Sequence, residues 1–268
     1  MSTFEIILLA VVQGITEFLP ISSDGHLAVV NALLAARGRG AAPDLLETTI
    51  VLHLGTLASV LVFYRRDVWR VLTRDRRALL PIVVATIPAV VVGLGIEKGL
   101  PDSASKPLLE SPLLAGFGFL VTAAALWFLG RRREGALDYP DTPLGRALAI
   151  GGAQAAAILP GVSRSGLTIS SGVALGLRRE SAAAFSFLMA IPAIGGAGLL
   201  KIIDVVEKGK PSTPLPTLAL GFVISMLVGL AALWVLLRML RRGRLELFVY
   251  YLVPLGIAVI VWQLAASN

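Results

Sequence analysis

Residues 159–168 read Leu-Pro-Gly-Val-Ser-Arg-Ser-Gly-Leu-Thr and lie in the middle of an apolar stretch that extends from residue 144 to residue 177. Proline interrupts the hydrogen-bond ladder of a helix, and glycine lowers helix stability. Pro160 and Gly161 therefore predict that one helix ends inside this stretch and that another begins after the serine-rich turn. We interpret the segment as a broken helical hairpin rather than an ordinary membrane span.

A similar break lies near the N-terminus, in the apolar stretch 4–36. Residues 19–25 read Leu-Pro-Ile-Ser-Ser-Asp-Gly, which echoes the order of residue types in 159–166. Three further matches follow at a nearly constant spacing, namely Ile87-Pro88-Ala89 with Ile191-Pro192-Ala193, Gly116-Phe117 with Gly221-Phe222, and Ala125-Leu126-Trp127 with Ala232-Leu233-Trp234. The chain is therefore predicted to contain an internal repeat.

The composition between and beyond the two breaks is that of a membrane protein. Hydrophobic residues make up 56% of the 268 residues and charged residues 15%, with a mean hydropathy of +0.82, whereas soluble domains carry about 25% charged residues. Six segments approach the ~20 apolar residues that a spanning helix needs: 48–64, 79–96, 112–130, 182–203, 216–237 and 245–266. The absence of cysteine excludes disulfides, thiolate catalysis and cysteine-ligated zinc.

Arginines cluster in three segments that connect the predicted spans. These clusters lie at residues 65–77, 131–146 and 238–244. Because basic loops stay on the cytoplasmic side, we predict that all three are cytoplasmic, which explains the net charge of +7 without a nucleic-acid partner. Residues 147–177 start and end beside such arginines, so they are predicted to form a re-entrant hairpin. The matching segment 4–36 would then enter and leave on the outer face.

These observations predict an all-α fold, a polytopic membrane helical bundle with inverted-topology repeats. Each repeat would contain one re-entrant, broken helix hairpin. Residues 1–268 would form a single transmembrane domain, with repeat 1 at about 1–135 and repeat 2 at about 143–268. We expect one extra span, 48–64, in the first half, because an odd number of extra spans inverts the second half. In transporters built this way, the substrate site lies where the broken helices face each other.

Both breaks carry polar residues that suggest chemistry. Gln13 and Glu17 are four residues apart and share one face of the helix before the first break. An ionisable group at membrane depth costs about 2.5–3.5 kcal/mol, so it is a functional candidate by default. Arg164 offers a planar fork of donors within a serine- and glycine-rich turn, which suits phosphate oxygens. The alternatives are an ion pair of Glu17 with His26 that pins the hairpin, and an arginine that caps helix carbonyls.

Together the two breaks would place a carboxylate, an imidazole, hydroxyls and an arginine inside a membrane. A lipid that carries a phosphate or diphosphate matches this set, because its head fits such a site while its tail stays between helices. His53 is more ambiguous. A structural hydrogen bond is favoured there over a catalytic role.

At these residues the sequence closely resembles the bacterial undecaprenyl-diphosphate phosphatase family, of the integral membrane bacitracin-resistance type. The resemblance is carried by Gln13-x-x-x-Glu17, Pro20-x-Ser22-Ser23-x-Gly25-His26 and Pro160-Gly161-x-Ser163-Arg164-Ser165-Gly166-x-Thr168, and it extends through His53-Leu54-Gly55-Thr56, Ser186-Phe187-Leu188 and Tyr250-Tyr251. It covers essentially the whole chain.

The resemblance implies hydrolysis of undecaprenyl diphosphate to undecaprenyl phosphate, which recycles the lipid carrier of peptidoglycan synthesis. It also implies the bacterial cytoplasmic membrane, a site open to the outer, periplasmic face, a role in bacitracin resistance, and dependence on a divalent cation, Mg²⁺ or Ca²⁺. Carried onto this chain, the catalytic residues are Glu17, Ser23, His26 and Arg164. The substrate-binding residues are Gln13, Ser22, Gly25, Gly161, Ser163, Ser165, Gly166 and Thr168. The metal ligands are Glu17, Gln13 and Asp24.

Our mechanistic hypothesis assigns the diphosphate to Arg164 and the attack to Ser23 or to a water molecule, with both routes open. His26 would act as base or acid, and Glu17 would orient His26 or hold the cation. Gln13 replaces a glutamate that is common in the family. Asp24 replaces a serine or threonine, and it would either cap the next helix or bind the cation, with capping favoured.

Two other functions compete with the phosphatase. A carrier that flips a polyprenyl phosphate without hydrolysis would share the inverted-repeat architecture, whereas a purely structural membrane protein would have no use for either polar hairpin. The sequence favours the enzyme, because a carrier needs neither a nucleophile nor a general acid beside the arginine. The expected partners are the polyprenyl diphosphate substrate and membrane lipids. The oligomeric state stays open, a homodimer included.

Overall fold

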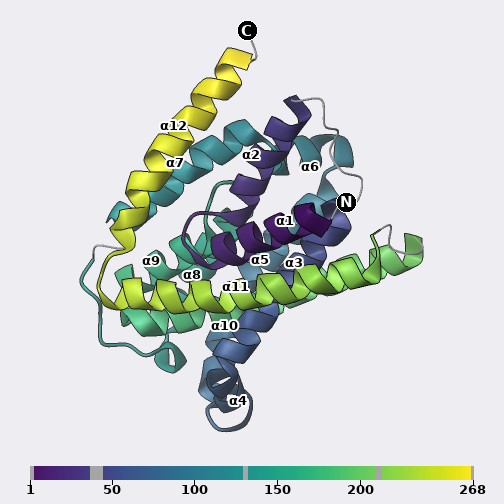
Figure 1. Cartoon of the computed structure of the whole chain (residues 1–268). Coiled ribbons are helices and arrows are strands. Elements are labelled where there is room, and N and C mark those ends of the chain that lie inside the picture. Colours follow the sequence, from purple (N-terminus) through teal and green to yellow (C-terminus); the bar gives the residue numbers. More distant parts are fainter. Residues whose placement is uncertain (1–2, 37–44, 129–131, 209–212, 267–268) are drawn as a thin grey trace.

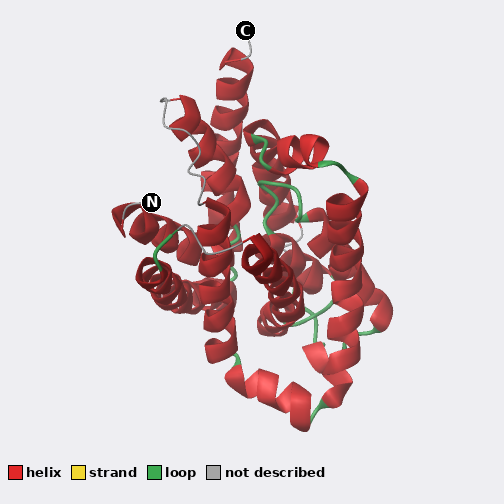
Figure 2. Cartoon of the chain, turned by 90° about the vertical axis from the view of Figure 1, so that its right-hand side faces the viewer, coloured by secondary structure: helices red, strands yellow, loops and turns green. Residues whose placement is uncertain are grey.

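The computed structural model describes residues 3–36, 45–128, 132–208 and 213–266. Within these residues every regular element is a helix, apart from an isolated bridge between Leu137 and Leu177, as Figure 2 shows. The α-helices are α1 (Thr3–Phe18), α2 (Ser23–Ala36), α3 (Leu45–Phe63), α4 (Arg65–Thr73), α5 (Leu79–Gly99), α6 (Asp102–Leu109), α7 (Pro112–Phe128), α8 (Leu144–Ala156), α9 (Arg164–Ala174), α10 (Arg179–Lys208), α11 (Leu215–Arg241) and α12 (Val249–Ala266). Three short 3₁₀ helices are η1 (Arg76–Ala78), η2 (Tyr139–Asp141) and η3 (Leu245–Phe248). The predicted all-α class is confirmed.

The two predicted breaks are present. The first separates α1 from α2 around Pro20, and the second separates α8 from α9 around Pro160. Both turns contain a residue with a left-handed backbone, Ser22 with a φ of 68° and Gly161 with a φ of 82°. Such a backbone reverses the chain direction, and it is unusual for a residue other than glycine. Each apolar stretch is therefore a pair of helices joined by a tight turn.

Helices cover the predicted spans, except that residues 129–130 of the span 112–130 lie outside the described residues. Within the part of the chain that the structure describes, four helical segments are long and apolar enough to cross a membrane, namely Arg76–Ile96, Arg179–Leu199, Leu215–Arg241 and Leu245–Ala266. A fifth is formed by α3 with α4 if this bent pair counts as one span. α7 is apolar but shorter, with 17 residues. The sequence did not predict α4 and α6 as separate helices. Parts of two predicted loops, residues 131 and 209–212, lie outside the described residues.

Each half of the described chain contains one broken helix pair and three longer helices, α3, α5 and α7 in the first half and α10, α11 and α12 in the second. The prediction of one extra span in the first half is therefore wrong. The packing also relates the halves, because α1 lies along α11, α8 lies along α5, and α7 lies along α12 (Figure 1). These contacts are equivalent in the two halves if α3, α5 and α7 correspond, in chain order, to α10, α11 and α12. The short sequence matches imply a different correspondence, which does not explain the contacts.

Glycines allow these helices to approach closely. A Cβ at Gly14 of α1 would lie 2.8 Å from the Val228 Cβ of α11, and one at Gly116 of α7 would lie 2.7 Å from the Ile260 Cγ1 of α12. A Cβ at Gly151 of α8 would meet the Ala85 backbone of α5. Since lipid is as apolar as leucine, membrane helices associate through this kind of close packing. The three helix contacts therefore depend on small residues.

The three predicted basic loops meet at one end of the molecule. Arg77 Nη1 lies 3.4 Å from Asp141 Oδ1, which joins the loop after α4 to the loop before α8. Arg178 pairs with Asp138 at 3.4 Å. The end of α11 joins the start of α10, because Arg241 Nε lies 2.8 Å from Glu180 Oε1. These contacts agree with the prediction that all the basic loops lie on the same side of the membrane.

Gly161 provides a test of the second break. We expect Gly161→Ala to lower the stability of the protein by about 3 kcal/mol or more, because the residue has a positive φ and its Cβ would overlap the Ala115 carbonyl oxygen. Gly152→Ala is the matched control, since nothing lies within 4 Å of its Cβ and alanine favours a helix by about 0.5–1 kcal/mol. Thermal unfolding in detergent would measure both. An unchanged melting temperature for Gly161→Ala would contradict this account.

Candidate active site

The two helix breaks are in direct contact, as the sequence predicted. A Cβ on Gly25 would lie 2.6 Å from Gly161 Cα, and one on Gly166 would lie 3.2 Å from Pro20 Cβ. Gly25 and Gly161 therefore touch backbone to backbone, which larger residues would prevent. The tight turns of both hairpins lie against each other, so the side chains next to them can form one site.

Glu17 lies at the centre of this site. Its side chain is 8% exposed, and its Oε1 accepts a hydrogen bond from Arg164 Nη2 at 2.6 Å. Its Oε2 accepts hydrogen bonds from Ser23 Oγ at 2.9 Å and from Gln13 Nε2 at 3.1 Å. One carboxylate thus joins α1, α2 and α9. The ion pair of Glu17 with His26, which the sequence left open as an alternative, is absent from the described residues, and Arg164 takes that place.

Two buried polar atoms of the site have no hydrogen-bond partner among the described residues. They are Nη1 of Arg164 and Oε1 of Gln13. Buried polar groups are normally paired, because an unpaired one costs about 1–3 kcal/mol. A free guanidinium donor suits a phosphate oxygen, and a free amide oxygen suits a cation. The unpaired atoms therefore match the two ligands that the sequence predicted.

Two helices also begin at the site. α2 begins at Ser23 and α9 begins at Arg164. The first N–H groups of a helix lack acceptors within the helix, and the helix dipole places partial positive charge there. Such termini bind phosphates. The helix starts therefore add backbone donors to the side chains at both breaks.

The remaining predicted hydroxyls hold the turns in place. Ser163 caps α9, and its Oγ accepts from Gly166 N at 3.1 Å. Ser165 Oγ lies 3.2 Å from Ser163 Oγ, and Thr168 Oγ1 lies 2.7 Å from Ser186 Oγ. Each of these hydroxyl groups contacts another part of the protein. In the described geometry they support the loop that presents Arg164.

Ser22, and not Asp24, occupies the cap position of α2. Because α2 begins at Ser23, the cap position belongs to Ser22, whose Oγ accepts from Gly25 N at 3.3 Å. The capping role favoured for Asp24 is therefore wrong. Asp24 lies in the first turn of α2, and its Oδ1 is 3.9 Å from His53 Nε2.

His26 points away from Glu17. Its Nδ1 lies 2.7 Å from the Ser22 carbonyl oxygen, and its Nε2 lies 2.7 Å from Tyr251 Oη. The ring also stacks on Tyr251, with 5.8 Å between centroids, and meets the edge of Phe119. Donation from Nδ1 to the carbonyl leaves Nε2 to accept from the tyrosine hydroxyl. Tyr251 is therefore a neighbour of the site that the sequence did not assign.

His53 is the imidazole closest to the central carboxylate. Its Nε2 lies 3.7 Å from Glu17 Oε2, and its Nδ1 lies 2.8 Å from the Thr49 carbonyl oxygen. The bond to Thr49 fixes the ring so that Nε2 faces Glu17. The sequence favoured a structural role for this residue, because nothing in the apolar helix shows that α3 passes the first break. The resemblance of His53-Leu54-Gly55-Thr56 to the family was the signal that could have indicated a place for His53 in the site.

Comparison with known proteins agrees with this geometry. The family model for bacitracin resistance protein BacA matches residues 6–258, which include both breaks. The chain belongs to the BacA family. A relative from Rhodopirellula baltica, named undecaprenyl-diphosphatase, is 43% identical over 260 residues and covers 97% of each chain. Relatives of the same name from Carboxydothermus hydrogenoformans and Alcanivorax borkumensis are 37% and 38% identical over 100% and 98% of this chain, and over 100% and 99% of their own.

Among the three metal ligands predicted for this BacA family member, Glu17 and Gln13 lie together. The described residues contain no cluster of three histidines, aspartates or glutamates that could hold a metal ion. Magnesium, however, is commonly held by one or two carboxylates together with substrate phosphates. The Glu17 carboxylate and the unpaired Gln13 Oε1 fit such an arrangement. The residues present therefore suit a cation that is held jointly with a diphosphate.

His53 should affect turnover more than stability in this BacA protein. We expect His53→Ala to lower kcat by about 10- to 100-fold, because Glu17 loses the neighbour that orients it. His53→Gln should recover part of the loss, since its amide can reach the same carboxylate. Steady-state kinetics beside thermal unfolding would separate the two effects. Equal losses of stability and activity in both variants would show that His53 is structural.

Proposed function

We propose that this protein hydrolyses undecaprenyl diphosphate to undecaprenyl phosphate and inorganic phosphate, and so recycles the lipid carrier of peptidoglycan synthesis. The observation that carries this proposal is the Ser23–Glu17–Arg164 cluster at the contact between the two breaks. The cluster combines a nucleophile, a carboxylate that accepts its hydrogen bond, and a guanidinium with a free donor. The names of the BacA relatives support the same activity.

The diphosphate would bind at the arginine side of this cluster. Arg164 Nη1 and the first N–H groups of α2 and α9 would face its oxygens. A fixed positive charge in a site with little water stabilises the negative charge that develops as a phosphoryl group transfers. A divalent cation held by Gln13, Glu17 and the diphosphate would supply further positive charge. Asp24 is the additional ligand candidate. The prenyl chain would remain between the helices.

The geometry favours Ser23 over water as the attacking group. Ser23 Oγ already donates to Glu17 Oε2, so Glu17 can take its proton as a bond forms to the terminal phosphorus. The bridging P–O bond breaks, and its electron pair stays on the oxygen that leaves with undecaprenyl phosphate. Water then hydrolyses the phosphoserine, which releases inorganic phosphate and restores the serine. His26, at the edge of the site, would protonate the leaving group only after it turns from Tyr251.

We further propose how the protein lies in the membrane. Each half would contribute one hairpin that enters and leaves on the same side and three spans. An odd number of crossings would then invert the second half (repeat 2, about 143–268) relative to the first (repeat 1, about 1–135). Positive loops would face the cytoplasm. The protein would then reside in the bacterial cytoplasmic membrane with its site open to the outer, periplasmic face.

Release of inorganic phosphate tests the proposal directly. Purified protein in detergent would be supplied with undecaprenyl diphosphate and either Mg²⁺ or Ca²⁺, and a chelator would remove the cation in a parallel sample. We expect release that disappears with the chelator and returns when the cation is restored. A folded protein that releases no phosphate with either cation would refute the phosphatase.

Lipid transport without hydrolysis is the rival function, and one feature of the helix packing supports it. The contact of α1 with α11 and that of α8 with α5 are the equivalent contacts that two inverted repeats would make, as in many transporters. A carrier would move polyprenyl phosphate across liposomes without releasing phosphate. The hydrogen bond from Ser23 to Glu17 favours hydrolysis, because transport needs no activated hydroxyl.

A further inference from the structure

α4 is a basic helix that lies across the end of α3. The two helices are bent by 72° relative to each other. α4 carries four arginines, Arg65, Arg66 and Arg70 within the helix and Arg74 directly after it. Arginine is costly in hydrocarbon, so α4 cannot continue the span. If α3 crosses the bilayer, a bend of this size places α4 nearly parallel to the membrane surface. In Figure 1, α4 forms the lower end of the molecule.

One face of α4 is fixed to the protein. Val71 is buried, and Asp67 Oδ1 accepts a hydrogen bond from Tyr139 Oη at 3.1 Å. Burial and the nearby Asp67 carboxylate raise the pKa of Tyr139 to about 12, so this hydroxyl stays protonated and continues to donate. The acidic residue of α4 is therefore turned inward, and it neutralises little of the outer face.

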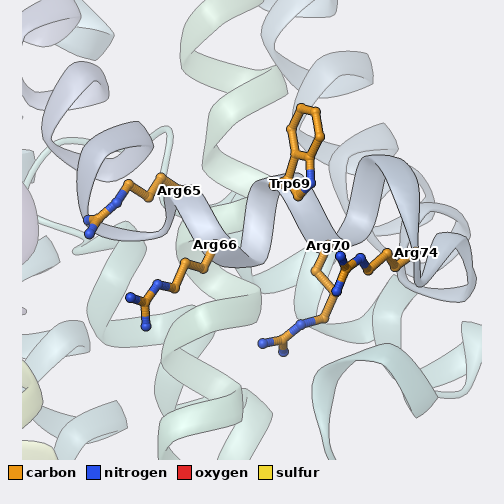
Figure 3. A pocket seen from close by; sticks show the side chains of 5 residues that line it. All are labelled: Arg65, Arg66, Trp69, Arg70 and Arg74. Carbon is orange, nitrogen blue, oxygen red and sulfur yellow. The ribbon is translucent and has the colours of Figure 1, made fainter.

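The outer face combines apolar and basic side chains. Trp69 is 65% exposed and Leu72 is 54% exposed. Figure 3 shows Trp69 on one side of the helix, with Arg66 and Arg70 on the other. Helices that lie in the interface between hydrocarbon and headgroups have this pattern, and tryptophan is enriched there. The apolar side would meet the acyl chains, and the arginines would meet the headgroups.

The arginines of α4 lack protein partners for most of their charge. Among the described residues, no carboxylate lies within ion-pair distance of Arg65, Arg66 or Arg74, and Arg70 approaches only Asp67, at 3.5 Å. By contrast, three nearby arginines, Arg77, Arg178 and Arg241, each pair with a carboxylate. The α4 arginines and Trp69 line a depression of about 540 Å³. Arg65 Nη1 donates to the Val62 carbonyl oxygen at 3.1 Å, which leaves its charge without a carboxylate partner. Guanidinium groups whose charge is not neutralised match phosphate oxygens.

We propose that α4 binds the headgroup of an anionic phospholipid, in the membrane leaflet at the end of the molecule where the basic loops meet. The guanidinium groups of Arg65, Arg66 and Arg74 contact the lipid phosphate, and Trp69 packs on its acyl chains. This site is separate from the Glu17 cluster and goes beyond the proposed phosphatase. Lipid bound there anchors the bend between α3 and α4.

Titration with defined lipids tests this site. Phosphatidylglycerol and phosphatidylcholine would be added to the detergent-purified protein, and bound lipid would be counted by native mass spectrometry. We expect Arg65→Gln/Arg66→Gln/Arg74→Gln to weaken phosphatidylglycerol binding at least about tenfold, with binding of phosphatidylcholine unchanged. The control Arg132→Gln/Arg133→Gln/Arg244→Gln removes equal charge from exposed loop arginines and should retain tight binding. Phosphate release by both variants would show that they are folded.

Three results would overturn the proposal. Equal phosphatidylglycerol affinity in the wild type and the α4 variant would show that α4 does not bind the lipid. Equal losses of affinity in both triple variants would show that only the net charge of the protein matters. Trp69→Ala separates lipid from free phosphate, because it should weaken phosphatidylglycerol binding several-fold and leave binding of inorganic phosphate unaffected. If inorganic phosphate alone bound to the α4 arginines and Trp69→Ala changed nothing, the occupant would be free phosphate and not a lipid.

Discussion

Arg164→Ala is expected to lower kcat/KM for phosphate release by about 10³-fold or more. A single preorganised donor to a developing oxyanion contributes about 10²–10³ in rate, and this substitution removes both the free Nη1 and the ion pair of Arg164 with Glu17. Release of inorganic phosphate from undecaprenyl diphosphate under saturating cation would measure the loss. Arg164→Lys should recover only part of it, because an ammonium group cannot form the same fork of donors.

The stability of the variant must be separated from its chemistry. Removing one partner of a buried ion pair leaves the other charge uncompensated, which costs about 3–5 kcal/mol. The double variant Glu17→Gln/Arg164→Ala removes that charge, so we expect it to recover the melting temperature while staying inactive. Arg146→Ala serves as an outside control, since Arg146 bonds the Leu175 carbonyl oxygen rather than the site. Near-normal activity in a folded Arg164→Ala protein would exclude the proposed phosphate site.

Ser23→Ala is expected to cause a loss of similar size, about 10³-fold or more in kcat, if the serine is the nucleophile. The melting temperature should change little, because the hydroxyl of Ser23 makes one hydrogen bond, to Glu17. Rapid acid quench with substrate labelled at the terminal phosphate is the decisive measurement. The wild type should carry label on a serine, and Ser23→Ala should carry none.

Ser163→Ala is the matched control for this serine. Its Oγ caps α9, so its loss should cost about 0.5–2 kcal/mol of stability and affect turnover less than the loss of Ser23. An unlabelled wild type, combined with a Ser23→Ala variant that keeps most of its activity, would instead favour direct attack by water. Glu17 would then activate that water.

The sequence alone determined the class of the protein and predicted the residues of its candidate site. High hydropathy and low charge predict membrane helices from local composition, because a bilayer requires long apolar segments wherever they fold. Proline and glycine in a helix act on their own backbone, so Pro20 and Pro160 predicted both breaks. Glu17 and Arg164 were recognisable as functional candidates, because a charged side chain is costly at membrane depth.

Only the tertiary structure decided which residues meet. The sequence left open a contact of Glu17 with His26, but the turn with positive φ at Ser22 directs that imidazole to Tyr251, far along the chain. His53 reaches Glu17 because α3 passes the first break, and the packing of uniform apolar helices leaves no local signal of such neighbours. The same holds for the bend that produces α4 and for the pairing of α1 with α11. Local residue types specify helices and breaks, whereas contacts between distant helices depend on glycine fit and on the packing of the whole bundle.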